Sequence, residues 1–342
     1  MLQQKNFSFS DNFYIHSKMT EIKKVHDDYR REVLSRMQFL LDTTKWTDCQ
    51  FLVGQEPNIE TFDAHKLILS LASPVFETMF HGALAEPGNV PIRIVDVKPE
   101  VFRKLLQYMY TDKINPDSFD VFMIYLAAQK YMLSQAKEQC IAYLAKHIDL
   151  SNVFDLYDFA TFHDEPVLIQ SCQSVMIQRT DELLRDPSFL DIKLSTFIMI
   201  LNQKNLNISS ELYLFKALKA YAIKHGLTRT DHSNQENDQS IDSAEGSPGE
   251  KVERMKLNPK KPTIDDALYR IRFLTLPPQE LAPELIATNG LLTLPEIGAI
   301  LMNCSMKRSD FPIPPGFSNC RKRRVPVQCV VGTSLSKLPT SA

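Results

Sequence analysis

Glycine is scarce in this chain, and long apolar runs are missing. The 342 residues include 10 glycines, which suits a largely helical chain with few tight turns. No stretch reaches the roughly 18 consecutive apolar residues that a membrane span needs. The first residues also lack the basic-then-apolar order of a signal peptide. We therefore expect no membrane partner, and a protein of the cytoplasm, with the nucleus as an additional compartment.

An excess of charge of one sign is also missing. Lys and Arg together number 39 and Asp and Glu together number 41, so the formal net charge is -2. This balance argues against nucleic acid as the main partner. The basic run at 321–324 is shorter than the usual five to eight residues of a nuclear signal. We interpret it as part of a solvated tail, with a nuclear signal or a phosphate patch as the alternative.

The common catalytic and metal-binding motifs are absent. The six cysteines form no C-x-x-C pair, and no histidine pairs with a cysteine or histidine at metal-ligand spacing. Gly-rich phosphate loops, G-x-S-x-G and H-E-x-x-H are also missing. Asp48 and His65 suit a structural charge pair that ties a strand to a helix, because a catalytic dyad would need a nucleophile and a cleft. We predict no catalytic, cofactor-binding or metal-binding residue, and a protein that is not an enzyme.

Residues 20–150 carry the pattern of an α+β domain. Apolar residues recur at helical spacing from Ile22 to Leu41, with charged residues on the other face. Short alternating stretches then predict strands near 49–53, at Phe62 and near 92–97. Helices are predicted between these strands and up to 147, one of them with Ser73 as its cap and Pro74 at its first position.

Residues 151–305 read as helical throughout, with breaks at 186–187 and 202–207. Residues 228–262 interrupt this pattern, because they have almost no large apolar side chain and no period. We predict a disordered insertion there, within one helical domain. Residues 1–19 are expected to be a flexible N-terminus, and residues 306–342 a flexible basic and polar tail.

The order of motifs in residues 45–112 resembles that of a BTB (POZ) domain. The matching stretches are Trp46-Thr47-Asp48-Cys49, Ala64-His65-Lys66, Ala72-Ser73-Pro74-Val75-Phe76, Met79-Phe80 and Leu106-x-Tyr108-x-Tyr110-Thr111-Asp112. Residues 151–225 resemble the all-helical BACK domain that follows many BTB domains, through Asn152-Val153, Asp164-Glu165-Pro166 and Ser209-Ser210-Glu211-Leu212. The resemblance implies an α+β BTB/POZ domain followed by an all-α BACK domain.

The subgroup that the chain resembles most is the BTB–BACK–PHR proteins, which are adaptors of cullin-3. In that subgroup a β-sandwich PHR domain follows BACK. The residues after Met306 are too few for such a domain. We therefore expect the sandwich to be missing, which leaves the usual client-binding surface in doubt.

The resemblance also implies two contact regions. BTB domains of this type dimerise, as homodimers or heterodimers, through an N-terminal helix, and the predicted dimer residues are Ile22, Val25, Tyr29 and Val33. Cullin-binding BTB domains carry a hydrophobic-x-Glu motif, which Leu84, Ala85 and Glu86 match. Tyr110 lies in the neighbouring contact region of the family. Physically, Leu84 would fill an apolar pocket and Glu86 would add a charge-assisted hydrogen bond.

The function implied is that of a substrate adaptor, which dimerises and links a cullin-3 RING ubiquitin ligase to an unknown client protein. A BTB scaffold or partner of transcriptional regulators that works without a ligase is the alternative. Zinc fingers, which DNA-binding BTB proteins usually carry, are missing from the sequence. The motif at 84–86 favours the adaptor.

Overall fold

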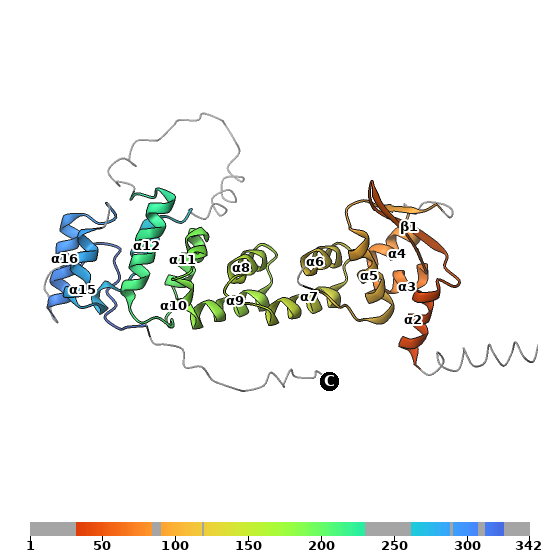
Figure 1. Cartoon of the computed structure of the whole chain (residues 1–342), viewed down its shortest axis with the longest axis horizontal. Coiled ribbons are helices and arrows are strands. Elements are labelled where there is room, and N and C mark those ends of the chain that lie inside the picture. Colours follow the sequence, from red (N-terminus) through yellow and green to blue (C-terminus); the bar gives the residue numbers. More distant parts are fainter. Residues whose placement is uncertain are drawn as a thin grey trace, which may run out of the picture. The chain divides into compact units, whose positions relative to one another are not determined.

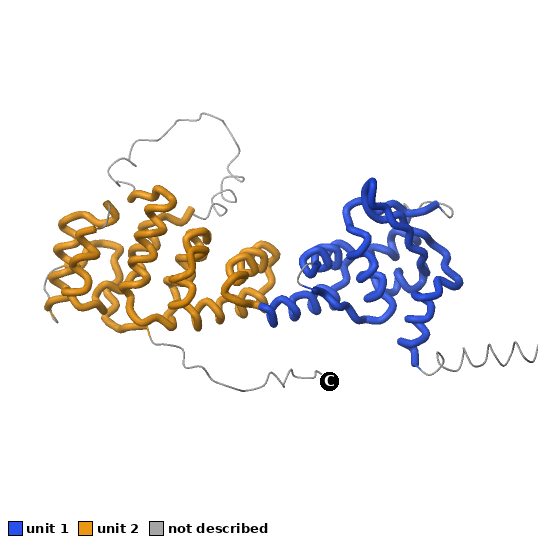
Figure 2. The backbone as a smooth tube through the Cα atoms, viewed as in Figure 1, with its two compact units in different colours: residues 1–147 blue, residues 148–342 orange. Residues whose placement is uncertain are grey.

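The computed structural model describes residues 32–83, 90–117, 120–229, 261–287, 290–306 and 312–324. It divides into two compact units, residues 1–147 and 148–342 (Figure 2). The predicted flexible N-terminus and most of the predicted insertion lie outside the described residues. Among the residues that are described, none of the helices has the length and apolar character that a membrane span requires.

The first unit combines a three-stranded sheet with helices, which confirms the predicted α+β class (Figure 1). Strand β1 lies in the middle, antiparallel to β2 and parallel to β3. The elements in chain order are α2 (Val33–Thr43), β1 (Cys49–Gln55), β2 (Asn58–Ala64), α3 (Lys66–Ala72), α4 (Pro74–His81), β3 (Ile92–Ile94), α5 (Pro99–Thr111), α6 (Val121–Lys130) and α7 (Ser134–Lys146).

The core of the first unit is aromatic. Phe51 of β1 is fully buried, and its ring lies 5.6 Å from that of Phe76 and 5.3 Å from that of Phe102. Phe76 in turn stacks on Tyr131 with ring centroids 4.7 Å apart. These contacts join β1, α4, α5 and the end of α6. Aromatic side chains stabilise such a core because each buries a large apolar area.

Helix α4 begins where the sequence predicts. The Ser73 hydroxyl accepts a hydrogen bond from the Phe76 N–H at 3.3 Å, and Pro74 occupies the first helical turn. The same hydroxyl donates to the Tyr131 carbonyl at 2.6 Å. Ser73 therefore caps α4 and also ties it to the end of α6.

The second unit is helical in its described residues, which confirms the expected all-α class. Its elements are α8 (Val153–Phe162), α9 (Pro166–Gln178), α10 (Thr180–Leu183), η1 (Pro187–Asp191), α11 (Leu194–Leu201), α12 (Glu211–His225), α14 (Ile264–Leu268), η3 (Phe273–Thr275), α15 (Pro278–Ile286) and α16 (Leu294–Ser305). The break expected at 202–207 falls between α11 and α12, and the one at 186–187 coincides with the start of η1, where Asp186 is the N-cap.

The structure corrects the expectation of a flexible tail for residues 312–324. Phe317 and Arg324 are both buried within the second unit. The basic run is therefore not wholly solvated: Arg321, Lys322 and Arg323 are exposed, and Arg324 points inward. Sequence alone missed this because the apolar and charged residues that receive the segment lie far away along the chain.

Candidate interaction surfaces

Helices α2 and α3 expose apolar side chains in the first unit. Leu67 and Leu71 stand four residues apart on α3 and are 69% and 81% exposed. Residues four apart share a helix face, while Leu69 between them is fully buried. Trp46, 74% exposed, lies just before β1. We call Trp46, Leu67 and Leu71 the apolar face.

Helix α2 is also incompletely covered. None of its residues is buried, and Val33 at its start is 59% exposed. Val33 is the one predicted dimer residue that the structure describes, since Ile22, Val25 and Tyr29 lie outside the described residues. The sequence reasoning missed Leu67 and Leu71. The signal that could have identified them is the run Leu67-Ile68-Leu69, because three consecutive apolar residues cannot all lie on the buried face of one helix.

His65 joins the start of α3 to two other segments. Its Nε2 lies 2.7 Å from the Lys45 carbonyl, which can only accept, so in the neutral ring Nε2 carries the proton. Nδ1 then accepts from the Tyr110 hydroxyl at 2.7 Å, and the His65 backbone N–H donates to the same hydroxyl at 3.1 Å. This arrangement fixes the segment that carries Trp46 against α3.

The direct charge pair expected between Asp48 and His65 is not among their contacts in the described residues. The Asp48 carboxylate instead accepts from the backbone N–H of Lys66 at 2.7 Å, in the first turn of α3. A carboxylate is favourable at a helix N-terminus because it satisfies a free N–H group. Asp48 still connects strand to helix, but through the backbone and not through His65.

Tyr110 is buried, at 4% exposure, so its side chain offers almost no area to a partner. Burial raises the pKa of its hydroxyl to about 12, and the nearby Cys49 and Asp48 act in the same direction. The hydroxyl therefore stays protonated and keeps its hydrogen bond to His65. Tyr110 supports the surface from beneath, which differs from the contact role that the family resemblance implied.

A groove of about 980 Å³ lies in the first unit, lined by residues of β1, β2, α3, α4 and β3. Leu84, Ala85 and Glu86 lie outside the described residues, between α4 and β3 in the sequence. The lining combines apolar and charged residues, which include Val75, Met79, Phe80, Ile92, Met132, Asp63, Lys66 and Arg93. Val90, where the described chain resumes, is also part of the lining. The lining therefore includes described residues that come shortly before and directly after 84–89 in the sequence.

A further exposed apolar pair lies at the beginning of the second unit. Phe162, the last residue of α8, is 84% exposed, and Val167 in the first turn of α9 is 62% exposed. The turn between them contains Asp164 with a positive φ of 54°. Helices α8 and α9 pack against each other, so this pair projects from a supported corner.

The described residues of these surfaces do not group reactive thiols or metal-ligating side chains of the kind that catalysis needs. Burial raises the pKa of the thiols of Cys49, Cys140 and Cys172 to about 12. Such thiols are protonated and weakly nucleophilic at neutral pH. Within the described ranges, no three His, Cys, Asp or Glu side chains are grouped so as to hold a metal ion. What the surfaces offer is apolar contact area with charged residues at its margin.

Two family models match the chain in sequence. The BTB/POZ domain model matches residues 37–148, and the BACK model, described as BTB And C-terminal Kelch, matches residues 153–235. Together they match more than half of the chain. Their order is the one that the sequence motifs indicated.

Similar proteins carry the same domain name. BTB/POZ domain-containing protein 6-A of Danio rerio is 33% identical over 187 residues, which are 55% of this chain and 34% of that protein. BTB/POZ domain-containing protein 3 of Homo sapiens is 28% identical over 298 residues, 87% of this chain and 52% of that protein. Human BTB/POZ domain-containing protein 6 is 28% identical over 307 residues, 88% of this chain and 51% of that protein.

The chain spans about half the length of these human relatives, and less of the zebrafish one. A solved structure of the BTB domain of zebrafish PATZ1 matches 33% of this chain and 88% of that one, with 24% identity and a TM-score of 0.29, too low to support a conclusion. The family models and the relatives agree with the α+β unit and the helical unit that follows it. The chain belongs to the BTB–BACK proteins, with a BTB/POZ domain in the first unit and a BACK domain in the second.

Proposed function

We propose that this chain is a non-enzymatic adaptor that dimerises through its BTB domain and holds client proteins against a cullin-3 RING ubiquitin ligase in the cytoplasm. The observation that carries the proposal is a BTB domain directly followed by a BACK domain. In this reading the client is a protein, and no nucleic acid, membrane or cofactor takes part.

The apolar face supports the dimer. Leu67, Leu71 and Trp46 are exposed, while Leu69 of the same helix is buried and His65 contacts the Lys45 carbonyl next to Trp46. Burying one such leucine contributes about 1.5–3 kcal/mol, so a second copy of the chain gains substantially by covering this face. Helix α2, which has no buried residue, adds to the uncovered area.

The groove of the first unit supports the cullin contact. Its lining includes the apolar residues Met79, Phe80 and Ile92, which suit an apolar side chain of a partner. Leu84 and Glu86, which fall between α4 and β3 in the sequence, would supply the anchor and charge of this chain that the family motif implies. Phe162 and Val167 of the BACK domain are exposed on its first two helices and offer a separate apolar surface to a partner.

The dimer is tested by replacing the two outward leucines of α3. Sedimentation of the full chain should show a dimer at micromolar concentration, and Leu67→Asp with Leu71→Asp should convert it to a monomer. Ile223→Asp, an exposed apolar position on α12, is the control and should stay dimeric. A wild-type chain that is monomeric throughout this range contradicts the proposal.

The cullin contact is tested by purified binding. The wild-type chain should bind cullin-3, and Leu84→Ala with Glu86→Ala should weaken that binding by about 2–4 kcal/mol while leaving dimerisation unchanged. Glu77→Ala, an exposed glutamate on the neighbouring helix α4, should bind as the wild type does. Dimerisation without any cullin-3 binding would instead support the scaffold without a ligase.

A further inference from the structure

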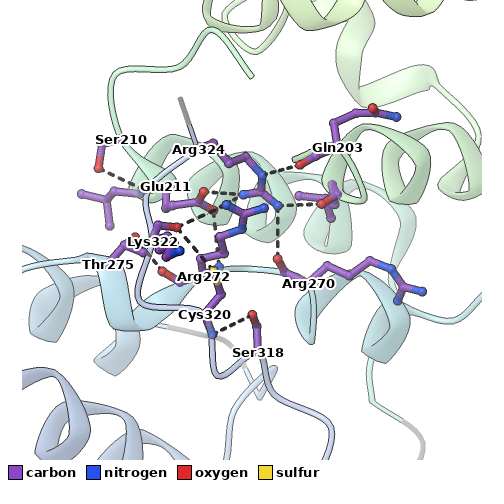
Figure 3. A network of polar contacts seen from close by, with 12 residues as sticks. Gln203, Ser210, Glu211, Arg270, Arg272, Thr275, Ser318, Cys320, Lys322 and Arg324 are labelled. Carbon is purple, nitrogen blue, oxygen red and sulfur yellow. Dashed lines mark hydrogen bonds and ion pairs between the residues drawn. The ribbon is translucent and has the colours of Figure 1, made fainter. Parts of the chain in front are cut away.

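Arg324 is a buried charge in a polar network of the BACK domain, and it comes from the segment that follows α16. It is 5% exposed, and Glu211, with which it forms an ion pair, is 3% exposed. Both terminal nitrogens and Nε of Arg324 are used, as Figure 3 shows. A guanidinium with all of its edges engaged is a bound group and not a surface charge.

The acceptors around Arg324 form a site with a defined shape. Nε donates to the Gln203 carbonyl at 3.0 Å, and Nη2 donates to the carbonyls of Leu201 at 2.6 Å and Arg270 at 3.3 Å. Nη1 donates to both carboxylate oxygens of Glu211. We call these three carbonyls and the Glu211 carboxylate the arginine socket.

Two features of the BACK fold make the socket negative before any arginine enters it. Helix α11 ends at Leu201, so the Leu201 carbonyl lies at the negative end of the helix dipole. Glu211 begins α12, and its carboxylate also accepts from the Arg272 N–H at 3.4 Å. A buried carboxylate without a cation is costly, so the socket requires a positive group.

The rest of the segment is shaped to lie on the same domain. The Phe317 ring packs 5.0 Å from that of Tyr269 and 6.1 Å from that of Phe273. Gly316 has a φ of 89°, and a side chain there would come within 2.7 Å of the Tyr269 ring. Arg272 donates to the Lys322 carbonyl at 3.2 Å, near Arg324. Residues 312–324, here called the strap, therefore have an apolar contact at one end and a charged one at the other.

We propose that the arginine socket is a recognition site for an arginine-bearing extended segment, and that the strap is its occupant within the same chain. The planar guanidinium reaches four groups at once, which the single ammonium of lysine does not do. The occupied socket fixes residue 324 against the ends of α11 and α12. This inference is independent of cullin binding and of dimerisation.

Chemical rescue tests the socket in the full chain. Arg324→Ala should lower the melting temperature, and millimolar ethylguanidinium should restore part of the loss, because it fills the vacated site. Ethylammonium should restore less, and neither should stabilise the wild type or Arg323→Ala, the matched variant of the exposed neighbour. Equal melting temperatures of Arg324→Ala and Arg323→Ala would overturn the proposal, as would equal rescue by the two cations.

Hydrogen exchange tests the strap. Amides of residues 312–324 in the wild-type chain should exchange at least about tenfold more slowly than in a synthetic peptide of the same sequence. Arg324→Lys, which keeps the charge, should lose most of this protection. If Arg324→Ala does not fold, the comparison of the wild-type chain with the peptide and with Arg324→Lys still tests whether the socket holds the strap. Exchange in the chain as fast as in the peptide would show that the socket does not hold the strap.

A mixing experiment identifies the occupant. Strap exchange between copies would let an Arg324→Ala chain and a Glu211→Ala chain stabilise each other when mixed, because one supplies the intact socket and the other the intact strap. We expect no such gain, since the strap acts within its own chain. A gain on mixing would overturn that part of the proposal.

Discussion

Two tyrosines of the BTB domain have buried hydroxyls that differ in their hydrogen bonding. The Tyr110 hydroxyl contacts both the Nδ1 and the backbone N–H of His65. The Tyr131 hydroxyl is buried and has no hydrogen-bond partner among the described residues. A buried polar group without a partner costs free energy, whereas a satisfied one does not. The same chemical change should therefore have opposite effects at the two positions.

Tyr110→Phe should destabilise the chain by about 1–3 kcal/mol, because it leaves two groups of His65 without a partner. Tyr131→Phe, its matched control, should be neutral or stabilising, since only an unpaired hydroxyl is lost and the stacking on Phe76 remains. Urea unfolding followed by tryptophan fluorescence measures both, through Trp46. Equal destabilisation by the two variants would refute the assignment of Tyr110 as a supporting residue.

At the scale of elements, Arg229 joins helices of the BACK domain that are distant in sequence. It forms ion pairs with Asp265 of α14 at 2.5 Å and with Glu296 of α16 at 2.7 Å, and it donates to the Tyr269 hydroxyl at 2.9 Å. Glu296 also accepts from the Thr293 N–H at 2.8 Å in a capping box. One guanidinium thus holds the first turns of two helices together.

Arg229→Ala should destabilise the chain by about 2–4 kcal/mol at neutral pH, because two largely buried carboxylates lose their cation. Arg179→Ala is the control: its pair with Glu182 is solvent-exposed, so little change is expected. Thermal or urea unfolding compares the two variants. A loss no larger for Arg229→Ala than for Arg179→Ala would show that the cluster contributes little.

The contribution of this cluster should depend on pH. Burial by itself would raise the pKa of Glu296, but hydrogen bonds from Arg229 and Thr293 hold it below its usual value. A lowered folded pKa stabilises the fold above the unfolded pKa of about 4.3, and this stabilisation is lost as pH falls through the folded pKa. The difference between wild type and Arg229→Ala should therefore be full near pH 7 and shrink below about pH 4. A difference that stays constant down to pH 3 would contradict this linkage.

At the scale of the whole molecule, the predicted insertion interrupts a helical domain whose parts nevertheless meet. The contact of Arg229 with Asp265 brings together the two sides of the interruption at residues 230–260. A loop between fixed, neighbouring ends adds little to the free energy of folding, because the closure entropy grows only slowly with length.

Replacing residues 232–259 with a short Gly-Ser linker should therefore leave the melting temperature within about 2 °C of the wild type, since shortening the predicted disordered insertion changes only its closure entropy. Calorimetry of both chains makes the comparison. The matched control combines the linker with Arg229→Ala, which removes the contact between Arg229 and Asp265. This variant should be much less stable than the chain with the linker alone. A large loss from the linker alone would mean that the segment contributes a structured element.

The sequence by itself determined the features that depend on near neighbours. The alternation at 49–53 predicts β1, and Ser73-Pro74 predicts the start of α4, because strand periodicity and helix capping involve residues only a few positions apart. The motif order also identified BTB followed by BACK, which the family models confirm. The helical pattern expected across 151–305 has a further interruption that was not predicted, since α14 ends at Leu268 and a short 3-10 helix, η3, follows at Phe273.

Only the tertiary structure decided which groups meet across long separations. An apolar run such as Leu67-Ile68-Leu69 does not state which side chain will face outward; the packing of α3 buries Leu69 and leaves Leu67 exposed. Arg324 looks like one of four solvated basic residues, yet it binds Glu211, 113 positions earlier. Such a pairing depends on where the ends of α11 and α12 are placed by the core around them, and local patterns carry no information about that distance.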